Sequence, residues 1–104
     1  MIDCKLFLDD IREPVGNGWL IARSYDAAVT IIKTLGIPRL ISFDHDLGIA
    51  ETGYDLAKFI IEYDQLHDDI DDSFMFKVHS ANPVGAKNIE CLLNNYVEFK
   101  KINK

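Results

Sequence analysis

The sequence is poor in basic residues, and this shortage excludes one class of partner. It has 11 lysine and arginine residues against 17 aspartate and glutamate residues, which gives a formal net charge of −6. Sequence-independent binding to duplex nucleic acid relies on Lys and Arg to neutralise phosphates, so duplex binding is not expected. A small phosphorylated ligand remains compatible with this charge if a metal ion offsets the carboxylates.

Long apolar runs and cysteine motifs are also missing. No run of about 18 apolar residues occurs, which excludes a membrane-spanning helix. Residues 1–10 carry an early acid and a short apolar run and are unlike a secretory signal, so we expect a cytoplasmic protein. The 2 cysteines, Cys4 and Cys91, lack CxxC spacing, which argues against a zinc or redox motif and predicts two buried, reduced thiols.

What the chain does contain is a mixture typical of one globular domain over residues 1–104. The content of 48% hydrophobic and 27% charged residues is ordinary for such a domain. Short apolar runs bounded by turn residues predict four strands, at residues 4–8, 19–23, 39–44 and 74–79.

Helical spacing of apolar residues predicts three helices between and after these strands. Their expected limits are Ser24 to Gly36, Thr52 or Gly53 to about Tyr63, and Asn82-Pro83 to about Asn95. The acidic stretch at residues 64–73 is interpreted as a surface loop. The alternating residues 96–102 are interpreted as a short edge strand.

Strands that alternate with helices predict an α/β fold with a mainly parallel sheet of four or five strands and right-handed crossovers. Only residues 9–18 separate the first two strands, which is short for a helical crossover. We therefore expect the first helix to be missing or collapsed to a turn.

Polar residues follow three of the predicted strands. In a parallel sheet the carboxyl ends of the strands lie along one edge, and ligands bind in the crevice there. The residues that should meet at this edge are Asp9 and Asp10, then Asp44, His45 and Asp46, and finally His79, Ser80 and Asn82. The sequence therefore predicts one polar pocket.

The acids of this pocket are candidates for a metal site. Mg²⁺ takes one or two carboxylates together with water and phosphate oxygens. Asp9, Asp10 and Asp44 are the predicted ligands of a divalent ion, Mg²⁺ or Mn²⁺. The alternative for the Asp9-Asp10 pair alone is a solvated turn or a cap.

The histidines are candidates for proton transfer. His45 lies between Asp44 and Asp46, and His79 ends the fourth predicted strand. General acid–base catalysis needs one group that removes a proton and another that delivers one, so His45, His79 and Asp46 are the predicted catalytic residues. The alternative for His45 is a surface loop histidine.

Phosphate binding is expected from four further residues. Arg12 could bind a phosphate bidentately, and a helix beginning near Asn82 offers free backbone N–H groups. Ser80 adds a hydroxyl, and Lys87 adds a positive charge. The alternatives are a surface ion pair for Arg12 and simple helix capping for Asn82.

Four segments occur in the order LFLDDIREP (6–14), SFDHDLG (42–48), TGYDLAKFI (52–60) and VHSANPVGAKNI (78–89). Together they resemble the cyclic-phosphate-processing receiver-like domain, a compact relative of two-component receivers, over about residues 4–95. The resemblance implies a flavodoxin-like three-layer sandwich with its pocket at the ends of strands one, three and four. It also implies hydrolysis of a cyclic phosphate or a related phosphoester.

Comparison with receivers proper is informative where the chain departs from them. By this resemblance Asp9 and Asp10 match the receiver acid pair, Asp44 the phosphoacceptor, Ser80-Ala81 the hydroxyl site and Gly53 the start of a helix. The added titratable residues are His45, Asp46 and His79. The Lys-Pro pair that ends the fifth receiver strand is absent, since Lys100 and Lys101 are followed by Ile102.

Two hypotheses follow. The favoured one is a metal-assisted phosphoesterase that acts on a cyclic phosphate at an RNA end or on a nucleotide-derived ligand. The alternative is a non-catalytic, degenerate receiver-like module for binding or regulation, of phage or bacterial origin. Histidines at the strand ends favour the enzyme, because a docking module does not need them there.

Overall fold

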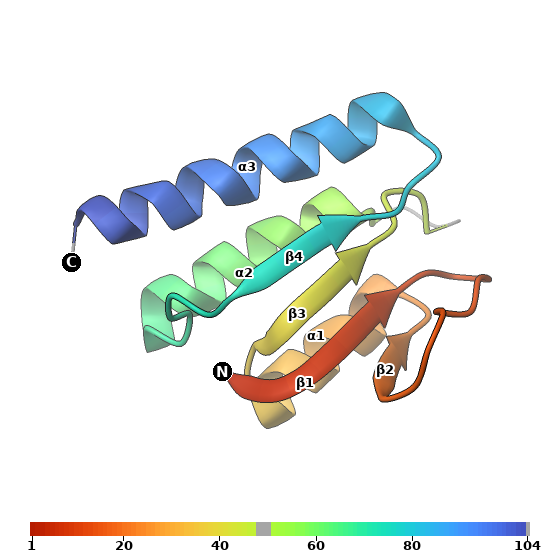
Figure 1. Ribbon diagram of the computed structural model, residues 1–104, viewed down its shortest axis with the longest axis horizontal. Helices are drawn as coiled ribbons and strands as arrows, with labels where there is room; N and C mark the ends of the chain where they lie inside the picture. The colour runs from red at the N-terminus through yellow and green to blue at the C-terminus, as the bar shows by residue number, and fades with distance from the viewer. Residues whose placement is uncertain (48–50, 104) are drawn as a thin grey trace.

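The computed structural model describes residues 1–47 and 51–103 and alternates strands with helices (Figure 1). The strands are β1 (Ile2–Leu8), β2 (Trp19–Ala22), β3 (Pro38–Phe43) and β4 (Met75–Val78), and the helices are α1 (Tyr25–Leu35), α2 (Gly53–His67) and α3 (Pro83–Ile102). Gly48, which closes the second of the four sequence segments, lies outside the described residues.

The four strands form one parallel sheet in the order β2-β1-β3-β4. β1 passes to β2 through residues 9–18, which contain no helix, so the expected loss of the first helix is confirmed. Gly16 and Gly18 have φ of 96° and 84°, a backbone region that L side chains rarely enter. The two glycines allow the tight path that replaces a helical crossover.

Side-chain caps begin the helices where the sequence predicts. Ser24 accepts a hydrogen bond from the N–H of Ala27 at 3.1 Å at the start of α1. Thr52 and Asp55 form a capping box at the start of α2. Asn82 caps α3, and Pro83 stands in its first turn, where its missing N–H needs no partner.

All three described helices pack on one face of the sheet. In Figure 1 α1 and α2 lie behind the strands, and α3 runs along the side of β4. One core cluster joins the strands to all three helices through residues such as Leu6, Ile41, Ile32, Ile60 and Leu93. The predicted α/β fold with a four-stranded parallel sheet is confirmed, but one helix layer of the expected three-layer sandwich is missing among the described residues, because no described helix follows β1 directly or comes after α3.

The second sheet face carries a different set of side chains. Lys5 pairs in register with Leu40 and Trp19, and Phe7 pairs with Ser42. Lys5 and Phe7 alternate with the core residues Leu6 and Leu8 along β1, so Lys5, Phe7 and their partners point away from the described helices. We call this side the open face of the sheet.

The carboxyl-terminal segment differs from the prediction. Residues 96–102 are the end of α3 rather than an edge strand, and residues 64–67 are the end of α2 rather than a loop. Asp64, which the sequence predicts to lie in an acidic surface loop, is only 2% exposed. It accepts hydrogen bonds from Tyr96 and from Lys100, which lie one helical turn apart on α3.

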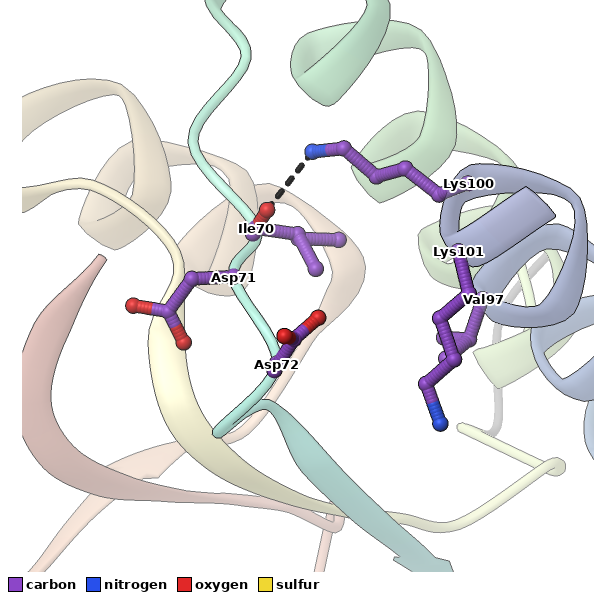
Figure 2. A pocket seen from close by; sticks show the side chains of 6 residues that line it. All are labelled: Ile70, Asp71, Asp72, Val97, Lys100 and Lys101. Carbon is purple, nitrogen blue, oxygen red and sulfur yellow. Dashed lines mark hydrogen bonds between the residues drawn. The ribbon is translucent and has the colours of Figure 1, made fainter. Parts of the chain in front are cut away.

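This polar contact joins α2 and α3 at the amino ends of the strands. The ammonium of Lys100 lies 2.8 Å from Asp64 and 3.0 Å from Asp68, and it donates to the carbonyl of Ile70 at 2.6 Å (Figure 2). The hollow beside it has a volume of about 10 Å³, room for about one water molecule. It is therefore a structural contact and not a ligand pocket.

Two smaller expectations are settled here as well. Cys4 is half-buried and Cys91 is exposed, and both are free thiols, so the prediction of two buried thiols is wrong for Cys91. In the part of the chain that the structure describes, no helix combines the length and apolar character needed to cross a membrane.

Candidate functional site

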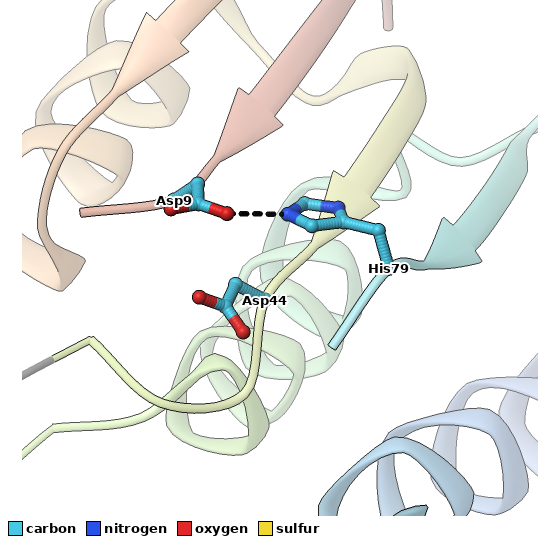
Figure 3. Close-up of side chains that lie close together, drawn as sticks. All are labelled: Asp9, Asp44 and His79. Carbon is cyan, nitrogen blue, oxygen red and sulfur yellow. Dashed lines mark hydrogen bonds and ion pairs between the residues drawn. The ribbon is translucent and has the colours of Figure 1, made fainter. Parts of the chain in front are cut away.

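Three strand ends bring their polar residues together, as Figure 3 shows for Asp9, Asp44 and His79. Ladder hydrogen bonds continue one residue beyond each strand: the N–H of Asp44 donates to Leu8 at 2.9 Å, and the N–H of His79 donates to Phe43 at 2.9 Å. One ligand atom from each of Asp9, Asp44 and His79 lies within 4.8 Å of the others. We call these three residues the strand-end cluster.

Asp9 is the most enclosed member of the cluster, with no exposed surface. One carboxylate oxygen accepts from the N–H groups of Ile11 and Arg12 at 2.9 and 2.8 Å. The other contacts His79 Nε2 at 3.0 Å and Arg12 Nε at 3.1 Å. Burial raises the pKa of Asp9, but these hydrogen bonds and the Arg12 charge outweigh it, so the pKa lies below its usual range.

Asp44 has the opposite electrostatics. It is 4% exposed, and both burial and the charge of Asp9 raise its pKa. The Arg12 guanidinium, whose Nη2 lies 3.8 Å away, and a hydrogen bond from Ser80 lower the pKa only in part. The site therefore holds more negative charge than its own cation neutralises, which favours a proton or a metal ion beside Asp44.

His79 is held in one orientation by three contacts. Its Nδ1 lies 2.7 Å from Ser42 Oγ, its Nε2 contacts Asp9, and its ring stacks on Phe7 with centroids 4.4 Å apart and planes at 4°. An ionised carboxylate can only accept, so Nε2 carries the hydrogen that points to Asp9. In a neutral ring Nδ1 then accepts from the Ser42 hydroxyl.

Ser42 and Phe7 are site residues that the sequence reasoning missed. Both lie within apolar runs that predict buried strands, so they read as core residues. Their register pairing on the open face places them directly under the His79 ring. The available signal was a lone serine in an apolar strand, two residues before Asp44 and hence on the same side.

Arg12 lies at the mouth of the cluster. Its guanidinium contacts both carboxylates and donates to the carbonyl of His79 at 3.3 Å, while 52% of its side chain remains exposed. The simple surface ion pair considered for Arg12 is thus an ion pair with two buried acids. The exposed part of the Arg12 side chain is available to an incoming anion.

His45 takes part in a different contact. Its Nδ1 lies 2.9 Å from Asp46 Oδ1, and its ring packs against the first turn of α3 at Gly85. A Cβ added to Gly85 would lie 2.3 Å from the ring, so a glycine is required for this approach. The structure therefore pairs His45 with Asp46 beside Asp44 but does not include it in the strand-end cluster.

The remaining predicted site residues differ in their contacts. Asn82 accepts from the N–H of Gly85 at 3.0 Å, which is the capping role considered for it. Ser80 accepts from the N–H of Asn82 at 3.1 Å and also hydrogen-bonds Asp44. Lys87 is exposed on α3, and Asp10 lies outside the strand-end cluster.

The donor atoms of the cluster suit a metal ion. Two carboxylate oxygens and one imidazole nitrogen are ligands that first-row divalent ions accept, with oxygens alone preferred by Mg²⁺. Asp9, Asp44 and His79 could hold such an ion, so His79 stands where the sequence predicts Asp10. Asp9 would have to exchange at least one of its present hydrogen bonds.

Comparisons with known proteins agree with this fold. A solved structure described as a yeast Spc42 trimeric coiled-coil segment, amino acids 181–211, fused to another protein, is similar with a TM-score of 0.57 and 20% identity. The similarity covers 95% of this chain and 77% of that one, and at this identity it shows the fold alone. No curated protein matches the chain.

The family comparison is more specific. A family model described as the cyclic-phosphate processing receiver domain matches residues 4–95, a span that begins within β1, reaches through most of α3 and includes every residue of the strand-end cluster. The parallel sheet with its acids at the carboxyl ends of β1 and β3 is the arrangement that the resemblance implied. The chain belongs to the family of cyclic-phosphate processing receiver domains.

Proposed function

We propose that this domain hydrolyses a cyclic phosphate at the strand-end cluster. The observation that carries the proposal is the convergence of two buried carboxylates, one imidazole and one partly exposed guanidinium at a single sheet edge. A structural role alone does not require an under-neutralised acid such as Asp44 there. The family's association with cyclic-phosphate processing supports the same reaction class.

In this proposal Asp9, Asp44 and His79 hold a divalent ion, Mg²⁺ or Mn²⁺, which when bound polarises a phosphoryl oxygen. Arg12 orients the phosphate through its exposed N–H groups, helped by Ser80. Asn82 contributes by capping α3 beside Ser80, and Lys87 adds positive charge nearby on that helix.

The reaction consumes one water molecule. Water oxygen forms a bond to phosphorus, one ring P–O bond breaks, and the product is an acyclic phosphomonoester. One proton leaves the attacking water, and one is delivered to the oxygen that leaves phosphorus. His45, oriented by Asp46, is the proposed proton-transfer residue outside the metal ligands, and His79 takes this role if the reaction proceeds without a metal.

A direct assay tests the proposal. A panel of nucleoside cyclic phosphates and RNA fragments ending in 2′,3′-cyclic phosphate is incubated with the protein and Mg²⁺ or Mn²⁺, and phosphorus NMR follows the products. Ring opening to a phosphomonoester is expected, with turnover lowered roughly 10²- to 10⁴-fold in Asp44→Asn and in His79→Ala.

The matched control is Lys101→Gln, an exposed change at the far end of α3, which should keep wild-type turnover. Equal turnover of Asp44→Asn and wild type on the same substrate would place the activity elsewhere. No ring opening on any member of the panel, with either metal, would contradict the enzymatic proposal.

A second candidate is a non-catalytic receiver-like module that binds a phosphorylated ligand. The saturation of Asp9 favours it, because both oxygens of that carboxylate already accept from Ile11, Arg12 and His79. A binding module would hold cyclic phosphate without opening it, which the same NMR spectra distinguish. A small phosphorylated ligand or RNA end as partner, and a cytoplasmic location, remain predictions under both candidates.

A further inference from the structure

The open face of the sheet carries aromatic and basic side chains beside the strand-end cluster. Phe7 and Trp19 contribute the aromatic rings, and their centroids lie 5.7 Å apart with an edge-to-face angle of 75°. The ammonium groups of Lys5 and Lys77 lie 4.8 and 5.5 Å from the Trp19 ring. Three strands thus supply a mixed aromatic and cationic surface where helices are missing.

Trp19 reaches across this face from its edge. It belongs to β2, whereas Lys77 belongs to β4, at the other edge of the sheet, and Phe7 lies on β1 between them. An indole that contacts both Phe7 and Lys77 therefore leans inward over the sheet. Its Nε1 donates to the carbonyl of Val15 at 3.3 Å, which anchors one edge of the ring.

A cavity of about 320 Å³ lies between this indole and the cluster. Its volume is at the lower end of the range for small-molecule sites, about 300–1,000 Å³. The lining residues are Phe7, Trp19, Ser42, Lys77, His79 and Arg12, with residues 13–15 at the rim. His79 belongs to both the cavity and the strand-end cluster, and Arg12 lines the cavity while it contacts Asp9 and Asp44, so the two are continuous.

The cavity is lined by more cationic than acidic side chains, in a chain of net charge −6. Arg12 and Lys77 line it, and its one acid, Glu13, is paired with Arg23. A ligand whose phosphate lies at Arg12 would extend its attached group along Phe7 and Trp19. Planar rings stack on such side chains, and polar ring atoms accept hydrogen bonds from a lysine ammonium group.

We propose that this cavity binds the nucleobase of the substrate, so the substrate class is a nucleoside cyclic phosphate rather than a base-free cyclic phosphate. The inference rests on the proposed function for the placement of the phosphate. The base stacks on Trp19, while Lys77 donates to a polar atom at its edge. Trp19 and Lys77 are thus specificity-determining residues outside the reacting centre.

Trp19 is the single tryptophan of the chain, so its fluorescence reports on this cavity alone. The probes are adenosine 2′,3′-cyclic phosphate and glycerol 1,2-cyclic phosphate, which share the five-membered phosphate ring and differ in the base. Titration uses the Asp44→Asn protein as well as wild type, so that binding is measured without turnover. The adenosine probe should quench Trp19 and bind roughly 5- to 150-fold more tightly than the glycerol probe.

Substitutions in the cavity test whether the preference for the adenosine probe arises there. Trp19→Leu and Lys77→Gln should each weaken binding of the adenosine probe, measured by calorimetry, and leave binding of the glycerol probe unchanged. Trp19→Phe keeps a stacking ring and should retain most of the preference, which covers the case in which Trp19→Leu does not fold. Lys101→Gln is the matched control and should bind both probes as wild type does.

The outcomes separate this inference from the proposed function. Equal affinity for the two probes, or an unchanged preference in Lys77→Gln and in any folded Trp19→Leu protein, would overturn the base site, even if both probes are hydrolysed. Quenching and a base preference without any hydrolysis would support the base site and contradict the enzyme.

Discussion

At the scale of single residues, Arg12 and Asp9 form the most constrained pair of the site. Arg12 contacts Asp9 through its backbone N–H and its guanidinium, and the same guanidinium reaches toward Asp44. One internal cation therefore faces two buried carboxylates. The charge that remains, carried mainly by Asp44 with its raised pKa, is what a bound cation would neutralise.

This imbalance predicts metal-dependent stability. With Mn²⁺ at 100 times its Kd, the folded state should gain about 2.7 kcal/mol, which corresponds to a rise of roughly 10–20 °C in the melting midpoint. Asp44→Asn should abolish the rise. Without metal, that variant should melt at or above the wild-type midpoint, because it removes a charge that burial and Asp9 disfavour.

Asp10→Asn is the matched control for this melt. The sequence predicts Asp10 as a ligand, whereas the structure leaves it outside the strand-end cluster, so the metal-induced rise should persist in Asp10→Asn. Equal midpoints of wild type with and without Mn²⁺ would remove the metal from the proposal. Loss of the rise in Asp10→Asn would favour the ligand set predicted from sequence.

Residue types and strand ends were sufficient to predict much of this site. Asp9, Asp44 and His79 follow apolar runs directly, and parallel strands bring such positions to one edge. The role of Ser42 and the contact between His45 and Gly85 could not be predicted, since both depend on register and on helix placement. The only local signal is the lone serine in an otherwise apolar strand, and it does not indicate a contact with His79.

At the scale of elements, the contact between α2 and α3 depends on one buried ion pair. The side chain of Asp64 is 1% exposed, and Lys100 is its only cationic partner among the contacts of the described residues. Burial raises the pKa of Asp64, but hydrogen bonds from Lys100 and Tyr96 outweigh it and lower the pKa. Burial lowers the pKa of Lys100, but its contacts with Asp64 and Asp68 outweigh it and raise the pKa.

Lys100→Met should therefore destabilise the fold by about 3 kcal/mol, because it leaves a buried carboxylate without its cation. Urea unfolding at pH 7 measures this difference. Lys101→Met, the exposed neighbour, should change the free energy of unfolding by less than about 0.5 kcal/mol. Equal unfolding midpoints of Lys100→Met and Lys101→Met would contradict the importance of the pair.

The same pair sets a pH dependence whose sign follows from the two pKa shifts. Because the folded pKa of Asp64 is lowered, its contribution is present above the unfolded pKa of about 3.9 and is lost as pH falls through the folded pKa. Because the folded pKa of Lys100 is raised, its contribution is present below about pH 10.4 and is lost as pH rises through the folded pKa. The stability difference between wild type and Asp64→Asn should thus be largest near neutral pH and shrink in acid.

Elements were predictable where a cap or a breaker marks them. Ser24, Thr52 and Asn82 each begin a helix as the sequence predicts. Residues 96–102 were assigned to a strand because their apolar and polar residues alternate over a short span. The segment is helical because Tyr96 and Lys100, one helical turn apart, both donate to Asp64. This is a tertiary contact, which the local residue pattern does not predict.

At the scale of the whole molecule, the two ends of the sheet have different roles. The carboxyl ends of the strands hold Asp9, Asp44 and His79, whereas the amino ends lie beside the contact of Asp64 with Lys100. The helices of the described residues cover one face of the sheet, which leaves the other face open beside the cluster. The ion pair between the two helices and the proposed chemistry therefore use separate sets of residues.

This separation leads to a prediction about phosphorylation. Asp44 matches the phosphoacceptor of receivers, but a receiver switch needs contacts that hold the phosphoryl group and bias a second conformation. Lys100 cannot supply such a contact, since it is bound to Asp64, Asp68 and Ile70 at the opposite end of the sheet. Among the described residues, the strand-end cluster contains no lysine, and the cation that contacts its two acids is Arg12.

We therefore expect no long-lived phosphoryl adduct on Asp44 after treatment with acetyl phosphate or phosphoramidate and Mg²⁺. Any acyl phosphate formed there lies beside a histidine and a second carboxylate, which can activate water for its hydrolysis. Intact-mass spectrometry within minutes of donor treatment measures the adduct, with Asp44→Asn as the matched control. A stable single-phosphate mass that disappears in Asp44→Asn would favour the regulatory module, because a site that stores a phosphoryl group is built for signalling and not for turnover.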